Sequence, residues 1–342
     1  MIFIVSFLGV LIFGAIFISY LVSAPGYVGE KMDNFDGSKF INRSDYEEQG
    51  LLDLLKWGLT RKTGPWNELT EADVEYGEKP KDRITDSTQV ITYVNHSTFL
   101  IQTNDLNILT DPVWSDRVSP ISFAGPKRMR PPGIKFEDLP DIDYVLISHN
   151  HYDHLDIQTV KKIEEIHSPT FIVPLGIDLY LKKKGIKKTI ALNWWEGTPL
   201  SDSVTVDAVE AQHFSSRGMF DRDKTLWAGF VIQSPNGNIY FAGDTGYNTF
   251  FTEIGNRYAP IKTAIIPIGA YIPRWFMGPV HVDPTQAVQI HNDVNAELTI
   301  GMHFGTFPLA DDAQDQPLND LQNALNGENF IVIEEGKSIV RN

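Results

Sequence analysis

The chain has 342 residues, a formal net charge of −15 at pH 7 and 42% hydrophobic residues. This length and composition suit a globular protein with a large core, and the negative charge argues against nucleic acid as a partner. Cysteine is absent, which excludes disulfides, thiolate ligands and a cysteine nucleophile. Any metal ion would therefore be held by imidazole and carboxylate groups.

An uncharged apolar segment, Ile2–Val22, lies at the start of the sequence. As a helix it would be about 31 Å long, enough to cross the hydrocarbon core of a bilayer. A cleaved signal peptide is the alternative, since Val22-Ser23-Ala24 resembles a cleavage site. However, no basic residues precede the segment and Pro25 follows that site directly. We therefore expect residues 1–24 to be a single-pass transmembrane anchor.

Residues 25–87 are rich in charge, glycine and proline, with one amphipathic helical patch near residues 46–57. We interpret them as a lead-in segment that packs on the core instead of folding alone. Lys31, Lys39 and Arg43 follow the apolar segment, which favours a cytoplasmic location for the rest of the protein.

Residues 88–342 contain short β-branched runs separated by turn residues, which predicts strands. The expected strands are 90–94, 98–103, 106–111, 143–148, 170–174, 204–211, 226–232, 238–244, 263–269, 298–304 and 330–336. Asn236-Gly237 predicts a hairpin turn, and Asp156 and Asp283 are expected N-caps of helices. Many strands with interspersed helices indicate an α/β domain of two sheets covered by helices.

The stretch "HNHYDH", His149 to His154, follows one of the expected strands and holds three of the nine histidines. In an extended segment, His149, His151 and Asp153 would point the same way, and His154 would begin the turn into the next helix. Imidazole and carboxylate are ligands for Zn²⁺, Mn²⁺ and Fe. The cluster therefore predicts a metal site.

Three further candidates, His213, Asp244 and His303, each lie just past the carboxyl end of an expected strand. Parallel neighbours would bring them to the same sheet edge. Five histidines and two aspartates are too many for one tetrahedral ion, but with one shared carboxylate they suit two ions that keep open positions for water. Such a site favours hydrolysis over a purely structural role.

These motifs are similar to those of the metallo-β-lactamase superfamily, whose H-x-H-x-D-H motif matches "HNHYDH". The resemblance is stronger to the branch of N-acyl-phosphatidylethanolamine-hydrolysing phospholipase D. The stretches that carry it include "VNHSTFLIQTNDLNILTDPVWSDRVSP", "AQHFSSRGMFDRDKTLWAGFVI", "IYFAGDTGY" and "HVDPTQA", and they span roughly residues 91–304. The resemblance implies an αββα sandwich with a di-zinc site at the edge between the sheets.

The resemblance also implies roles for single residues. One zinc ion would bind His149, His151 and His213, the other would bind Asp153, His154 and His303, and Asp244 would bridge them. His281, before an expected helix N-terminus that would favour an anion, matches the family's histidine near the substrate phosphate. The implied reaction is phospholipase D cleavage of N-acyl-phosphatidylethanolamine to phosphatidic acid and an N-acylethanolamine, in which a metal-bound hydroxide attacks phosphorus.

The sequence also suggests roles for several residues outside the predicted ligand set. We expect His96 to make a structural hydrogen bond, with a role in the site as the alternative, and His167 and His291 to lie at the surface. Asp111 fits either a turn or a hydrogen bond to a ligand histidine. Trp275, Phe276 and Met277, shortly before His281, fit either an apolar wall for the substrate's acyl chains or ordinary core.

Two alternative functions stay open at this stage. The same fold could hydrolyse a lactone or another small phosphodiester, or it could serve as a non-catalytic, membrane-tethered binding factor. The expected partners are a phospholipid and a membrane, and the sequence leaves room for a homodimer.

Overall fold

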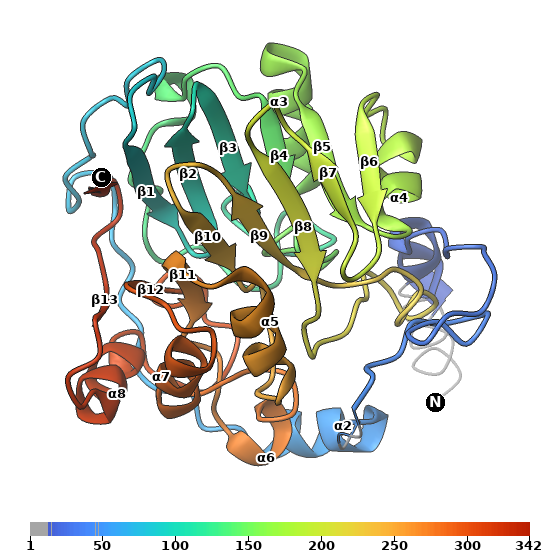
Figure 1. Cartoon of the computed structure of the whole chain (residues 1–342). Coiled ribbons are helices and arrows are strands. Elements are labelled where there is room, and N and C mark those ends of the chain that lie inside the picture. Colours follow the sequence, from blue (N-terminus) through green and yellow to red (C-terminus); the bar gives the residue numbers. More distant parts are fainter. Residues whose placement is uncertain (1–12, 15, 45, 47) are drawn as a thin grey trace, which may run out of the picture.

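The computed structural model describes residues 13–14, 16–44, 46 and 48–342, and places two seven-stranded sheets against each other (Figure 1). The first sheet has the spatial order β14 (Ser338–Arg341), β1 (Gln89–Asn95), β2 (Thr98–Thr103), β3 (Leu106–Thr110), β4 (Tyr144–Leu146), β5 (Thr170–Pro174) and β6 (Thr189–Leu192). The second has the order β13 (Phe330–Ile331), β12 (Thr299–Met302), β11 (Ile261–Pro267), β10 (Asn238–Phe241), β9 (Gly229–Gln233), β8 (Thr205–Val209) and β7 (Gly197–Pro199).

The two sheets share one pairing pattern. In the first, β14, β1, β2 and β3 pair antiparallel, and β3, β4, β5 and β6 pair parallel. In the second, β7, β8, β9 and β10 pair antiparallel, and β10, β11, β12 and β13 pair parallel. Each sheet is therefore half antiparallel and half parallel, and alternate strands of the antiparallel half run in the same direction as the parallel half.

Helices cover the outer faces of both sheets. Helices α3 (Ile157–His167) and α4 (Ile177–Lys183) lie on the first sheet, and α5 (Phe250–Tyr258), α7 (Pro284–Asp293) and α8 (Gln316–Ala324) lie on the second (Figure 1). Between residues 48 and 342, the remaining helical elements are α2 (Leu51–Thr60), α6 (Arg274–Met277) and the 3₁₀ turn η1 (Phe136–Asp138). The expectation of two sheets covered by helices is confirmed.

Successive strand residues point to opposite faces, so each sheet packs apolar side chains on both of its faces. In β4, Leu146 joins the apolar cluster between the sheets, whereas Val145 joins the cluster beneath α3 and α4. Asp156 caps α3 by accepting a hydrogen bond from the Gln158 backbone N–H, and Asp283 caps α7. Both expected N-caps are confirmed.

The segment before β1 runs along the core and is fixed to it by backbone hydrogen bonds. Phe40 N donates to Asp223 O at 2.7 Å, and Gly64 N donates to Asp311 O at 2.8 Å. The Phe35 and Phe40 side chains are buried within the central apolar cluster. The expected helical patch forms α2, which begins at Leu51.

The expected anchor, Ile2–Val22, lies largely outside the described residues. Its described part, residues 13–14 and 16–22, is helical. Within the part of the chain that the structure describes, no helix combines the length and the apolar character needed to cross a bilayer.

Candidate metal centre

The candidate ligands meet at one edge of the sandwich because they follow strands that run in the same direction. In the first sheet, His96 follows β1, Asp111 follows β3 and the "HNHYDH" loop follows β4. In the second, His213 follows β8, Asp244 follows β10 and His303 follows β12. The sequence-predicted ligands therefore come from both sheets.

The backbone of "HNHYDH" differs from the extended geometry expected from the sequence. Strand β4 ends at Leu146, so the motif forms a turn, in which Leu155 N donates to His151 O at 2.8 Å. The alternation of side-chain direction in an extended chain, which would point His149, His151 and Asp153 the same way, therefore does not apply to this motif. Accordingly, His149 and His151 face one group of ligands and Asp153 joins the other.

The first group consists of His149, His151 and His213. The His151 Nδ1 atom lies 2.9 Å from His149 Nε2 and 3.3 Å from His213 Nε2. Two nitrogens bound tetrahedrally to zinc at about 2.0–2.1 Å are about 3.3 Å apart, so this spacing fits one ion. Burial lowers the pKa of His151 to about 3 and lowers that of His149 and His213 well below the usual range. All three imidazoles are therefore neutral at pH 7, as metal binding requires.

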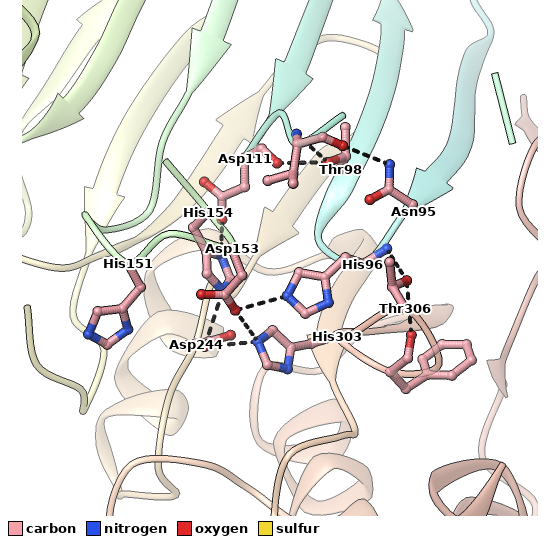
Figure 2. Close-up of polar contacts among 12 residues, drawn as sticks. Asn95, His96, Thr98, Asp111, His151, Asp153, His154, Asp244, His303 and Thr306 are labelled. Carbon is pink, nitrogen blue, oxygen red and sulfur yellow. Dashed lines mark hydrogen bonds and ion pairs between the residues drawn. The ribbon is translucent and has the colours of Figure 1, made fainter. Parts of the chain in front are cut away.

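The second group consists of Asp153, His154, His303 and Asp244 (Figure 2). His303 Nε2 lies 3.3 Å from Asp153 Oδ2 and 3.1 Å from Asp244 Oδ2, and His154 Nε2 lies 3.2 Å from each of these oxygens. Among the described residues, no lysine or arginine forms an ion pair with either carboxylate. Two buried carboxylates without such a partner require a cation close by.

The protonation of the second group reflects that requirement. Burial lowers the pKa of His303, but the carboxylates of Asp244 and Asp153 outweigh it and raise the pKa to about 9. Burial likewise opposes protonation of His154, and the same carboxylates with Asp111 raise its pKa well above the usual range. A metal cation at this position would take over the charge that these imidazoles otherwise carry.

Asp244 lies between the two groups. Its Oδ2 atom is also 3.9 Å from His149 Nε2 and 3.9 Å from His213 Nε2. The preceding Gly243 has φ +62°, and a Cβ there would lie 2.7 Å from Ser148 Cβ. Glycine is therefore required to bring the Asp244 backbone this close to the first sheet.

Hydrogen bonds to the Nδ1 atoms of three candidate ligand histidines select their tautomers. Asp111 Oδ2 lies 2.7 Å from His154 Nδ1 and accepts from Ser148 Oγ at 2.6 Å. Ser148 Oγ is in turn 2.9 Å from His149 Nδ1, and His213 Nδ1 is 3.0 Å from Val280 O. Each Nδ1 therefore holds the proton, which leaves the Nε2 lone pair for a cation. Of the two roles considered for Asp111, the structure shows the hydrogen bond, here to the candidate ligand His154.

The residues fit a metal centre on their own geometry. Among the described residues, the buried atoms Asp244 Oδ1 and His281 Nδ1 have no hydrogen-bond partner, and His154 Nε2 has only its ion pairs with Asp153 and Asp244. Such atoms are costly unless another group satisfies them. Four sets of three or more histidines and aspartates have possible ligand atoms within 4.8 Å of one another. All members of these sets come from the two groups described above, His96 and His281.

His96 lies in the centre, a role that the sequence left open as the alternative to a structural hydrogen bond. Its Nε2 atom lies 3.0 Å from Asp153 Oδ2, and its ring centroid is 4.1 Å from that of His303 (Figure 2). Burial and His303 lower the pKa of His96 to about 3, so the neutral ring donates to the carboxylate. Its position just after β1, equivalent to that of the other candidates, was the available signal.

His281 lies next to His213 and Asp244, and its side chain is 13% exposed. Its Nδ1 atom is 3.9 Å from Asp244 Oδ2, and Arg274 Nη1 donates to its backbone oxygen at 2.7 Å. Burial lowers the pKa of His281 to about 4, so it is a neutral hydrogen-bonding group at pH 7. The Asp283 carboxylate caps the helix that follows, α7, by accepting from Gln286 N at 2.9 Å, so one of the backbone N–H groups at this terminus is already satisfied.

Trp275, Phe276 and Met277 form α6 and contact α2. The Phe276 ring stacks on Trp57 with centroids 5.0 Å apart, and Met277 is buried in the same small apolar cluster. Trp275 is 41% exposed, with Lys56 Nζ 4.3 Å from its ring centroid. These contacts fix α2 beside the segment that leads to His281.

The expectation that His167 and His291 lie at the surface is wrong. The His167 side chain is 5% exposed, and His291 is buried with Nδ1 2.7 Å from Thr299 Oγ1. Neither side chain belongs to any of the metal-ligand sets.

Arg217 fixes the "HNHYDH" loop from its outer side. Its Nη1 atom donates to the Asn150 and Leu155 backbone oxygens at 2.8 and 3.0 Å. The guanidinium also lies 3.9 Å from the Tyr152 ring centroid. Asp221 accepts from the Arg217 backbone N–H and from Ala24 N, so this clamp is continuous with the end of the N-terminal helical segment.

Comparison with known proteins agrees with this geometry. Residues 106–304, which span every candidate ligand except His96, match the family described as "Beta-lactamase superfamily domain". The chain belongs to the beta-lactamase superfamily. Within the superfamily it is 40% identical over 263 residues to N-acyl-phosphatidylethanolamine-hydrolyzing phospholipase D 1 of Caenorhabditis elegans, covering 72% of this chain and 74% of the relative.

Two other superfamily members extend the comparison. The mitochondrial N-acyl-phosphatidylethanolamine-hydrolyzing phospholipase D of Saccharomyces cerevisiae is 35% identical over 225 residues, which cover 64% of this chain and 48% of that protein. The solved structure of Igni18, a metallo hydrolase from Ignicoccus hospitalis, is 25% identical with a TM-score of 0.57 and covers 75% of this chain and 99% of Igni18. The present chain is therefore a metal-dependent hydrolase of the phospholipase D-like branch.

Proposed function

We propose that the protein is a membrane-anchored phosphodiesterase with two Zn²⁺ ions, which cleaves N-acyl-phosphatidylethanolamine to phosphatidic acid and an N-acylethanolamine. The observation that carries the proposal is the convergence of five histidines and two aspartates, in which both carboxylates are buried and form ion pairs with imidazoles alone among the described residues. The substrate follows from the names of the worm and yeast relatives.

In this proposal His149, His151 and His213 hold one ion and Asp153, His154 and His303 hold the other, while Asp244 bridges. When bound, such ions supply a hydroxide at neutral pH and neutralise charge on a phosphate. Mn²⁺ or Fe would fit the same ligands. His96 donates to Asp153 and keeps its carboxylate directed at His303.

The substrate's phosphate would approach from the side of His281, where a neutral imidazole can donate one hydrogen bond to a phosphate oxygen. Arg274 holds this histidine in place and also pairs with Asp283 at 3.2 Å. Asp244, kept ionised by His154 and His303 despite its burial, has no proton to give. We therefore assign orientation of the phosphate to His281. Trp275, Phe276 and Met277 are proposed to contact acyl chains.

Exposed apolar side chains support attachment to a membrane. Helix α2 has no buried residue, and its leucines are 47–88% exposed: Leu51, Leu52, Leu54, Leu55 and Leu59. Phe13, Phe17 and Tyr20, in the described part of the expected anchor, are also exposed. We propose a single-pass anchor with the hydrolase on the cytoplasmic side. Resistance of the membrane-bound protein to alkaline extraction, and its protection from protease in sealed vesicles, would test both statements.

The decisive experiment offers the zinc-loaded, detergent-solubilised protein three substrates: N-acyl-phosphatidylethanolamine, phosphatidylcholine and a lactone. We expect phosphatidic acid from the first alone. Hydrolysis of the lactone alone would replace the proposal with the small-substrate alternative. Absence of turnover with all three, despite bound zinc, would favour the non-catalytic binding factor.

A further inference from the structure

The backbone of His213 lies where no strand can satisfy it. Strand β8 ends at Val209, and His213 is a fully buried residue of the loop that follows. A buried N–H or C=O group without a partner destabilises the fold by about 1–3 kcal/mol. The position of this candidate ligand therefore depends on whatever satisfies its peptide groups.

The side chain of Asn42 satisfies both. Its Nδ2 atom donates to His213 O at 2.9 Å, and its Oδ1 atom accepts from His213 N at 3.2 Å. Asn42 Oδ1 also accepts from Trp227 Nε1 at 3.1 Å, which fixes the plane of the amide. One amide thus pairs with the peptide groups of His213 in the same way as a neighbouring strand would.

The residues next to Asn42 hold the same loop. Arg43 Nη1 is 3.0 Å from Glu210 Oε2, and Ser44 Oγ donates to Gln212 Oε1 at 3.2 Å. The Gln212 side chain in turn donates to Pro279 O at 2.8 Å, one residue before the Val280 carbonyl that accepts from His213 Nδ1. Residues 42–44 therefore lie against the whole stretch from Glu210 to His213.

We propose that Asn42 is a positioning residue of the metal centre, acting through His213. The segment that joins the expected anchor to the hydrolase fold then contributes directly to metal binding. Asn42 holds the His213 backbone while Val280 fixes the His213 ring, so the Nε2 atom stays directed at His149 and His151. The inference rests on the metal centre of the proposed function, and only on that part of it.

The test compares Asn42→Ala with Asn34→Ala in the full-length, detergent-solubilised chain. Asn34 lies in the same segment and donates from Nδ2 to Asn193 Oδ1 at 2.7 Å, away from the ligands. Zinc affinity is measured by competition with a chelator, and Co²⁺-loaded protein is followed by its visible absorption. We expect Asn42→Ala to weaken one of the bound ions about 10-fold or more and to change the Co²⁺ spectrum.

Asn34→Ala should leave the zinc affinity and the Co²⁺ spectrum as in the wild type, even if it lowers the melting temperature. Equal zinc affinity of Asn42→Ala and wild type would overturn the inference, and so would an equal loss in both variants. If the wild type itself binds no metal, the proposed function fails instead. Asn42→Asp provides a second variant: it keeps an acceptor for His213 N but has no donor for His213 O, so it should also bind zinc more weakly.

Discussion

The substitution Asp111→Asn tests whether hydrogen bonds behind the ligands determine the metal affinity. Asp111 Oδ1 accepts from Ser148 N at 2.7 Å, while Oδ2 accepts from Ser148 Oγ at 2.6 Å and lies 2.7 Å from His154 Nδ1. Asparagine has a single acceptor oxygen. If this oxygen stays with Ser148 N, the new amide group faces His154 Nδ1 and favours the tautomer with the proton on Nε2, which cannot bind a cation.

The size of the effect follows from the bond that is lost. A hydrogen bond to a charged group contributes about 1.5–3 kcal/mol, which corresponds to about 10- to 150-fold in an equilibrium constant at about 1.4 kcal/mol per factor of ten. Replacing partners of this kind behind metal-bound histidines weakens metal affinity by about 10- to 100-fold. We therefore expect the ion at His154 to bind about 10- to 100-fold more weakly.

The assay is a zinc titration against a chelator, with Asp143→Asn as the matched control. Asp143 also accepts from a backbone N–H, that of Asn107 at 2.8 Å, and pairs with Arg83, but it lies at the opposite end of β4. A folded Asp111→Asn variant with wild-type affinity for both ions would refute the reasoning. An equal loss in the control would point to general destabilisation instead.

Three further outcomes follow from the geometry of the centre. Asp244→Asn, which removes the carboxylate proposed to bridge the two ions, should reduce activity at least about 100-fold, whereas the exposed Asp202→Asn should not; similar activities would contradict the proposed bridging role. Arg217→Lys cannot donate to two carbonyls in the fork geometry of arginine, so it should destabilise the fold by about 2 kcal/mol and lower the melting temperature; an unchanged melting curve would count against the clamp. In metal-free protein, the lowered pKa of His151, about 3, means that only the unfolded chain takes up this proton as the pH falls below about 6.5, and stability drops. The raised pKa of His303, about 9, means that the unfolded chain loses its proton first as the pH rises above about 6.5, and stability drops again. The metal-free melting temperature should therefore peak near pH 6.5, and metal should remove the decline at pH 8.5; identical profiles with and without metal would disprove this coupling.

The sequence predicted the two-layer sheet architecture because most strands are β-branched runs bounded by turn residues. It did not predict β6, β7 and β14, which are short segments at or near sheet edges. In β7, for example, Gly197 and Pro199 have low strand propensity. Pairing with a neighbouring strand makes these segments extended, and such pairing is not visible in a local pattern.

The ligand positions were accessible from the sequence because each follows a strand, but the geometry of their loops was not. The turn after Leu146 separates His151 from Asp153, and this turn depends on distant contacts such as Arg217 with Asn150 O and Leu155 O. For the same reason the sequence could not predict the hydrogen bond between His96 and Asp153, which lie 57 positions apart. Asn42 was likewise hidden, since it contacts His213 across 171 positions.

The division of the ligands between two similarly paired sheets has a mechanical consequence. Each ion would take two ligands from the half that contains β1–β6 and at least one from the half that contains β7–β13, so neither half could hold an ion by itself. A bound metal ion would then cross-link the two halves. It would stabilise their association by about 4 kcal/mol when the metal concentration is about 1,000 times the dissociation constant. Metal-dependent activity would therefore require that both halves are associated. Two fragments of the chain, divided between β6 and β7, should bind each other more tightly with zinc than without it.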